Sequence, residues 1–127
     1  MFRFVKDAYF MFKLTAIIAT LSGMSAPGLA EFAVISKEIE FVSMVEGKDL
    51  QRVFINLNIL SDGEILGSAV TKPVTGNWQW KEGYFCRSLF WGQRDLGYNC
   101  QEVSITGEKI RFTSDKGEGD YADFTLR

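Results

Sequence analysis

The residues best suited to chemistry in this chain are Trp91, Gln93 and Arg94, which lie within one short segment. An indole can stack on a sugar or a peptide, and an amide and a guanidinium can hydrogen-bond to either. If the three lie at the tip of a hairpin, we expect them to bind a small ligand, because binding residues collect on such tips. The structural alternative is that Trp91 folds back over the open end of the sheet while Arg94 pairs with Asp95 in solvent.

The two cysteines, Cys86 and Cys100, are better suited to a disulfide than to catalysis or metal binding. The chain has no histidine, so a Cys–His nucleophile is impossible, and two cysteines alone make a poor zinc site. A hairpin centred on Gln93 would place the two cysteines opposite each other and Phe90 opposite Leu96. Cα atoms in such a pair lie about 4.5 to 5.5 Å apart, a separation that suits a disulfide.

The acidic segment at 115–120 has the composition of a calcium loop but not its spacing. Lys116 lies in its middle and the twelve-residue calcium pattern is absent, so we predict a solvated turn and no metal site. Paired carboxylates for glycoside hydrolysis stay open as an interpretation, since acids are plentiful, but no pair stands out. The chain has neither a Gly-x-Gly-x-x-Gly fingerprint nor a phosphate-binding loop. We therefore assign no catalytic residue and no cofactor.

Residues 1–30 have the three-part pattern of a cleavable signal peptide. Three cations precede an apolar stretch at 14–24, and small residues lead to Ala30, after which we expect cleavage. Translation starts at Met1 or Met11. The apolar stretch is shorter than the roughly 20 residues that a spanning helix needs, so no membrane span is expected after cleavage. We predict a periplasmic or secreted protein, in a compartment where thiols are oxidised.

The remaining residues, 31–127, are expected to form one domain, because a chain of 127 residues has room for a single core. Removing the signal peptide takes away three cations and one anion, so the formal charge changes from −2 to −4. The basic residues are scattered singly among acids and form no stripe. Nucleic acid is therefore not an expected partner.

Periodicity predicts one helix followed by a run of strands. Ser36 can cap a helix over 36–46, which Gly47 ends. From Leu50 onward the period changes to two, most clearly over 53–59, which is typical of half-buried strands. Pro73 is expected to interrupt the connection before the third strand. The predicted strands are 53–59, 64–70, 77–80, 84–90, 98–105, 109–114 and 121–126.

Seven short strands with brief connections predict a mainly β fold, an antiparallel up-and-down meander or a small barrel, carrying one short N-terminal helix. Trp78 and Trp80 have the same parity, so both project to one side of their strand. They fill the core or form an exposed aromatic platform, and the large area that aromatic side chains bury favours the core.

Three segments of the chain carry a resemblance to a known family: Gly-Tyr-Phe-Cys-Arg at 83–87, Gly-Tyr-Asn-Cys-Gln at 97–101 and Ile-Arg-Phe-Thr-Ser-Asp at 110–115. The chain resembles a family of small secreted bacterial proteins that often carry the label dihydrodipicolinate reductase. The resemblance implies the same β fold and a Cys86–Cys100 bridge. A reductase of that name binds NAD(P)H on a Rossmann domain, and this chain lacks the fingerprint. The resemblance therefore supplies no catalytic residues.

We favour a small secreted or periplasmic binding or accessory domain, whose partner is a small ligand, a glycan or an envelope protein. One alternative is an enzyme, either a carboxylate hydrolase or the reductase of the family label. A second alternative is a structural component of the cell envelope.

Overall fold

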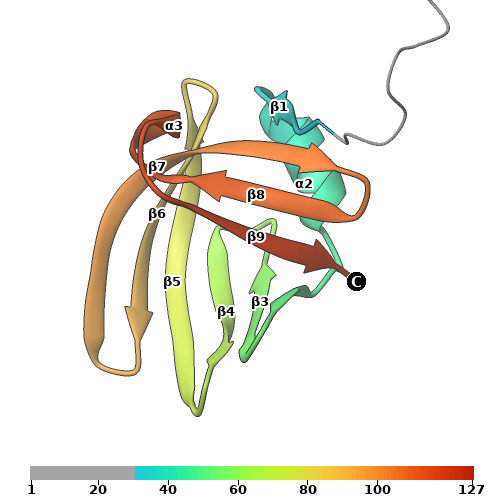
Figure 1. Cartoon of the computed structure of the whole chain (residues 1–127). Coiled ribbons are helices and arrows are strands. Elements are labelled where there is room, and N and C mark those ends of the chain that lie inside the picture. Colours follow the sequence, from blue (N-terminus) through green and yellow to red (C-terminus); the bar gives the residue numbers. More distant parts are fainter. Residues whose placement is uncertain (1–30) are drawn as a thin grey trace, which may run out of the picture. The chain divides into compact units, whose positions relative to one another are not determined.

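The structure, a computed structural model, describes residues 31–127, and the predicted signal peptide, its cleavage site and both candidate starts lie outside them. In residues 31–127 nine strands form one antiparallel sheet, with two short helices (Figure 1). The strands are β1 Ala33–Ile35, β2 Leu50–Arg52, β3 Ile55–Ile59, β4 Glu64–Ala69, β5 Lys72–Lys81, β6 Tyr84–Trp91, β7 Arg94–Thr106, β8 Lys109–Thr113 and β9 Tyr121–Leu126. The helices are α2 Glu38–Val45 and α3 Ser114–Gly117.

Strands β2 to β9 form a closed barrel. Each pairs antiparallel with the next in chain order, and β9 returns to β2. This closing seam is short, with only the pairs Leu50–Leu126 and Gln51–Thr125, extended by two backbone hydrogen bonds of 3.0 Å between Asp49 and Arg127. Closure leaves these eight strands without an open edge. The predicted small antiparallel barrel is confirmed, and the seven predicted strands correspond to β3–β9.

Helix α2 packs against one end of the barrel and fills it with Phe41, which is fully buried. The ring of Phe41 lies 5.4 Å from that of Trp78, 5.0 Å from that of Trp80 and 5.1 Å from that of Phe85, measured between centroids. Both tryptophans of β5 therefore serve the core and form no exposed platform. Aromatic side chains bury large areas, so this cluster contributes much of the packing at the α2 end of the barrel.

The predicted helix is present, but the predicted cap is wrong. The helix begins at Glu38 after Lys37, and no side chain caps it. The backbone carbonyl of Ser36 instead accepts a hydrogen bond of 3.2 Å from the indole N–H of Trp80. Ser36 therefore ties the start of the helix to β5, which a local capping rule could not reveal.

Several strand boundaries differ from the prediction, among them the start of β7, which is Arg94 and not residue 98. The strand predicted at 53–59 begins only at Ile55, because Val53 and Phe54 form a tight turn between β2 and β3. Phe54 has a φ of 63°, a conformation that favours glycine, so its residue type gives no turn signal. Pro73 does not interrupt the chain either: it is the second residue of β5 and pairs with Ser68. Proline is tolerated near the beginning of a strand.

The β6–β7 hairpin confirms the predicted pairing of Cys86 with Cys100, and the two form a disulfide. The predicted pairing of Phe90 with Leu96 is wrong. Phe90 pairs with Asp95, and the register shifts by one residue between Leu89 and Phe90. Leu96 is the extra residue of this β-bulge and has no pairing partner in β6. Such a bulge bends its strand more sharply, which helps the sheet to curl into a barrel.

Candidate functional site

The interior of the barrel contains an apolar cavity of about 140 Å³. Its wall comes from β3, β4, β6, β7, β8 and β9, and it has two polar members, Arg87 and Gln101. The apolar members are Leu57, Ile59, Ile65, Phe85, Leu89, Phe112, Ala122 and Phe124. A cavity of this size and composition holds a small apolar group, since engineered cavities of about 150 Å³ bind benzene.

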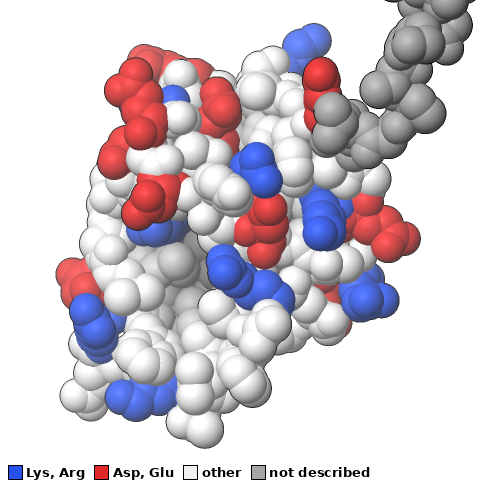
Figure 2. Space-filling view, in the orientation of Figure 1, with Lys and Arg blue, Asp and Glu red and all other residues white. Residues whose placement is uncertain are grey.

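A wider space of about 300 Å³ adjoins this cavity at the end of the barrel away from α2. It shares four wall residues with the inner cavity: Leu57, Leu89, Ala122 and Phe124. Arg52, Trp91 and Leu96 are among its remaining wall residues, and we call this space the mouth. Figure 2 shows a hollow in this face of the molecule with basic residues around it. The inner cavity and the mouth together form one site that a ligand could enter from this end.

Arg87 is the unusual member of this site. It comes from β6, where alternation turns Phe85, Arg87 and Leu89 to the interior, and it pairs in register with Trp78 of β5. Its Nη1 donates a hydrogen bond of 2.9 Å to the carbonyl of Gly97. Burial lowers the pKa of Arg87 from its ordinary value, because a desolvated cation is less stable than a hydrated one. The group nevertheless stays protonated at any physiological pH.

No carboxylate within residues 31–127 forms an ion pair with Arg87, since the ion pair found in this part of the chain joins Arg111 to Asp123. The walls of the inner cavity and of the mouth contain neither aspartate nor glutamate. Of the five N–H groups of the guanidinium, the hydrogen bond to Gly97 uses one. The remaining donors are available to an acceptor on a ligand.

The segment at α3 supports the β7 side of the site. Asn99 and Asp115 are joined by two hydrogen bonds, of 2.8 Å from Asn99 Nδ2 to Asp115 Oδ1 and of 2.9 Å from the Asp115 backbone N–H to Asn99 Oδ1. Gln101 Nε2 donates to Ser114 Oγ at 3.2 Å. Asn99 pairs with Arg87 in register, so these bonds hold the strand beside the guanidinium in place.

Of the three sequence-predicted ligand residues, Trp91 lines the mouth, whereas Gln93 and Arg94 do not. Trp91 forms part of the wall, and its indole N–H donates to the carbonyl of Ala69 at 2.9 Å. Gln93 lies in the exposed turn, and Arg94 is exposed at the start of β7. Arg94 and Asp95 form no ion pair within residues 31–127. The mouth thus contains Trp91, whereas the deeper polar residue, Arg87, was missed.

A third hollow lies at the α2 end, where Glu38 and Asp62 are two of its wall residues. Two carboxylates thus line one hollow, which is the arrangement that the hydrolase hypothesis requires. Asp62 Oδ1 accepts the backbone N–H of Glu64 at 3.0 Å, a bond that forms the β3–β4 turn. The indole N–H of Trp78 donates to the carbonyl of Leu60 at 2.8 Å. These polar groups serve the local fold.

Metal ligands are not grouped in the part of the chain that the structure describes: no three Asp, Glu, Cys or His residues there could hold an ion together. The segment predicted as a solvated turn at 115–120 overlaps the short helix α3, whose Asp115 and Lys116 have φ values of 54° and 55°. None of the helices within residues 31–127 is long and apolar enough to cross a membrane.

No family model, no curated protein and no solved structure matches this chain.

Proposed function

We propose that this protein is a secreted or periplasmic binding protein whose barrel holds a small ligand with an apolar body and an anionic group. The observation that supports the proposal is Arg87, a half-buried guanidinium in a mostly apolar cavity, without a carboxylate partner in residues 31–127. An unpaired charge in an apolar environment costs free energy. A ligand carboxylate or phosphate at Arg87 would offset that cost with charge-assisted hydrogen bonds.

The shape of the site favours an elongated ligand. The inner cavity of about 140 Å³ has room for a group near the size of benzene, and the mouth adds a space of about 300 Å³ beyond it. Eight of the ten residues that line the inner cavity are apolar. A chain-like amphiphile, such as a medium-chain carboxylate, fits this combination of size and apolar wall, with Arg87 in the inner cavity and Arg52 at the mouth as the cations of the site.

The Cys86–Cys100 disulfide supports a location outside the cytoplasm, because such bonds persist in oxidising compartments. Export would follow from the signal peptide predicted at 1–30, and the resemblance to small secreted bacterial proteins supports the same location. N-terminal sequencing of the protein recovered from producing cells tests this part of the proposal, with Glu31 expected as the first residue.

Titration with two probes of equal chain length tests the ligand class. Decanoate and decanol are each added to the protein purified from producing cells, and binding is followed by calorimetry and tryptophan fluorescence. We expect decanoate to bind more tightly than decanol, and Arg87→Gln to reduce this preference about tenfold to hundredfold. That range corresponds to about 1.5–3 kcal/mol for a hydrogen bond to a charged group.

Arg94→Gln is the matched control, because it removes the same charge from an exposed position outside the inner cavity. It is expected to leave the preference for decanoate unchanged. The proposal is wrong if the wild-type protein binds neither probe saturably, or if Arg87→Gln weakens both probes equally. Near-UV circular dichroism of each variant shows whether its core is intact.

A further inference from the structure

The end of the barrel around the mouth exposes several apolar side chains to solvent. Exposing such side chains to water does not stabilise the fold. Three hairpin turns meet there, β2–β3, β4–β5 and β6–β7, and we call their residues 52–54, 69–72 and 91–96 the rim. Val53 and Phe54 are each 78% exposed, Val70 is 66% exposed and Leu96 is 46% exposed. Solvated turns usually have polar side chains or glycine at such positions, but all four of these residues are apolar.

The three turns form one continuous surface. The backbone N–H of Val70 donates to the carbonyl of Phe54 at 2.7 Å, which joins the first turn to the second. The Trp91 indole N–H donates to Ala69, and the backbone N–H of Gly92 donates to the carbonyl of Pro73 at 2.8 Å, which joins the second turn to the third. The exposed apolar side chains therefore lie on neighbouring turns of the same end of the barrel.

Two of these exposed apolar residues also have an unfavourable backbone conformation. Phe54 and Val70 have φ values of 63° and 58°. A β-branched residue such as valine is a clear outlier there, where glycine or asparagine would be more stable. Two bulky apolar residues thus occupy exposed positions that neither solvation nor backbone preference favours. Strain of this kind is retained where a function requires it.

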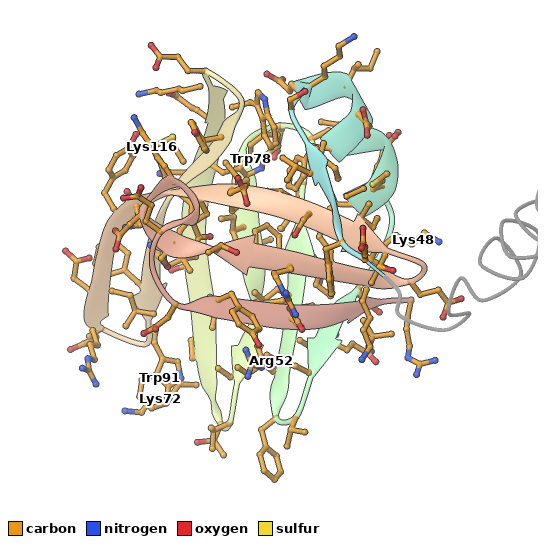
Figure 3. The ribbon with its side chains drawn as sticks, turned by 45° about the horizontal axis from the view of Figure 1, so that its top comes forward. Lys48, Arg52, Lys72, Trp78, Trp91 and Lys116 are labelled. Atoms are coloured by element: carbon orange, nitrogen blue, oxygen red, sulfur yellow. A yellow bond between two sulfur atoms is a disulfide. The ribbon has the colours of Figure 1, made fainter. Side chains whose placement is uncertain are left out.

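The charge of the rim is opposite to that of the rest of the described chain. The rim has three cations, Arg52, Lys72 and Arg94, and one acid, Asp95, whose carboxylate already accepts the backbone N–H of Gly97 at 2.7 Å. The other residues of 31–127 include eight cations and fourteen acids. Figure 3 shows Arg52, Lys72 and Trp91 in the lower part of the molecule, away from Trp78. Figure 2 shows acidic residues gathered in the upper part around α3.

We propose that the rim docks on an anionic phospholipid surface, with Val53, Phe54 and Val70 inserted at the headgroup boundary and Arg52, Lys72 and Arg94 facing lipid phosphates. Apolar tips interspersed with cations match the pattern of segments that lie in a membrane interface, and tryptophan is enriched at that depth. Each cation near an anionic surface contributes attraction. Docking in this orientation would turn the mouth toward the bilayer. The proposal rests on the rim alone and would stand whatever the cavity binds.

Vesicle flotation tests this proposal. The protein purified from producing cells is mixed with phosphatidylcholine vesicles that contain or lack phosphatidylglycerol, and every variant is compared with wild type carrying the same N-terminus. We expect binding only to the anionic vesicles, weakened by salt. The pair Lys72→Gln and Arg94→Gln should lower vesicle affinity about 25-fold, at roughly fivefold for each cation.

Lys37→Gln with Lys48→Gln is the matched control, because it removes the same charge beside α2 and should leave vesicle affinity within about twofold of wild type, as expected for cations far from the contact. Phe54→Ser should lower affinity about tenfold or more, since a buried phenylalanine is worth that much. Its control is Ile39→Ser, at a side chain that is 79% exposed on α2. All six positions are exposed, so the variants are expected to fold.

Three outcomes would overturn the proposal: no vesicle binding by wild type, equal binding to both vesicle types, or equal losses in the rim and control variants. If Phe54→Ser instead dissociates a dimer seen in sedimentation, the rim is a contact between two copies of the chain. The decanoate titration in solution should be the same in wild type and in all rim variants. A failure of vesicle docking is thus distinguishable from a failure of the proposed ligand binding.

Discussion

Cys86 and Cys100 lie directly opposite each other in β6 and β7, with their Cα atoms 3.9 Å apart, and the disulfide between them crosses the hairpin that supplies Arg87. The bridge lies one position before Arg87 along β6. It therefore fixes the two strands at the point where the guanidinium enters the cavity.

Replacing both cysteines, Cys86→Ala with Cys100→Ala, should lower the free energy of unfolding by about 3 kcal/mol. The bridge closes a loop whose ends are 14 residues apart, and it restricts the unfolded chain accordingly. Guanidinium unfolding at neutral pH measures the change. Adding a reductant to wild type should reproduce the loss and should leave the double variant unchanged. Equal stability of wild type and double variant would contradict the prediction.

Asp123→Asn should lower the melting temperature at neutral pH, and the difference from wild type should shrink in acid. Arg111 makes two hydrogen bonds to Asp123, of 2.7 Å and 3.0 Å, and its guanidinium lies 3.9 Å from the ring centroids of both Phe32 and Tyr121. The hydrogen bond from Arg111 lowers the pKa of Asp123 from its ordinary 3.8 and raises the pKa of Arg111.

The sign of this effect follows from the lowered pKa. A carboxyl that is more acidic in the folded state contributes stability above the unfolded pKa, and that contribution disappears as the pH falls through the folded value. Thermal unfolding followed by circular dichroism, at neutral pH and at several values below 3.8, measures it. Glu108→Gln is the control, since Glu108 is exposed and makes no ion pair in residues 31–127. A difference that grows in acid would disprove the assignment.

Ala122→Leu should block the ligand site while leaving the barrel folded. Ala122 lines both the inner cavity and the mouth, so added methyl groups would occupy space that a ligand needs. We expect decanoate affinity to fall at least about tenfold, because the larger side chain would keep more than one or two ligand methylenes from being buried. Because the added methyl groups enter a cavity, the change in stability should not exceed the roughly 1–3 kcal/mol that extra methylenes cost in a filled core. Ala33→Leu, at an exposed position in β1, is the control and should leave decanoate affinity unchanged.

The strand order and the disulfide could be predicted because each depends on local signals. Alternation in β3 and the spacing of turns indicated the meander. Cys86 and Cys100 lie at equal distances in sequence from the turn at Gln93, which indicated that they pair. The turn at Val53 and Phe54 could not be predicted, since residues of these types rarely occupy it and tertiary contacts hold it there. The bulge at Leu96 likewise depends on how the barrel curls.

The candidate site was predicted in part. Trp91 was identified and does line the mouth. Arg87 was overlooked, although the sequence carries a signal for it. Phe85, Arg87 and Leu89 alternate along the strand, so the cation lies on the same face as two apolar residues. A charge on the buried face of a predicted strand is worth a search for a partner. Closure of the barrel, which converts that face into a cavity, is a tertiary property that periodicity alone does not specify.

The short seam between β2 and β9 has a consequence for how the chain matures. These two strands are far apart in sequence, and the ring is complete only when β9, the last strand along the chain, meets β2. Joining such distant segments is slow, because the intervening chain must first be ordered. Until then both strands present open hydrogen-bonding edges that can pair with other molecules. The time between emergence of β2 and arrival of β9 is thus the period in which a newly made chain is most prone to aggregate.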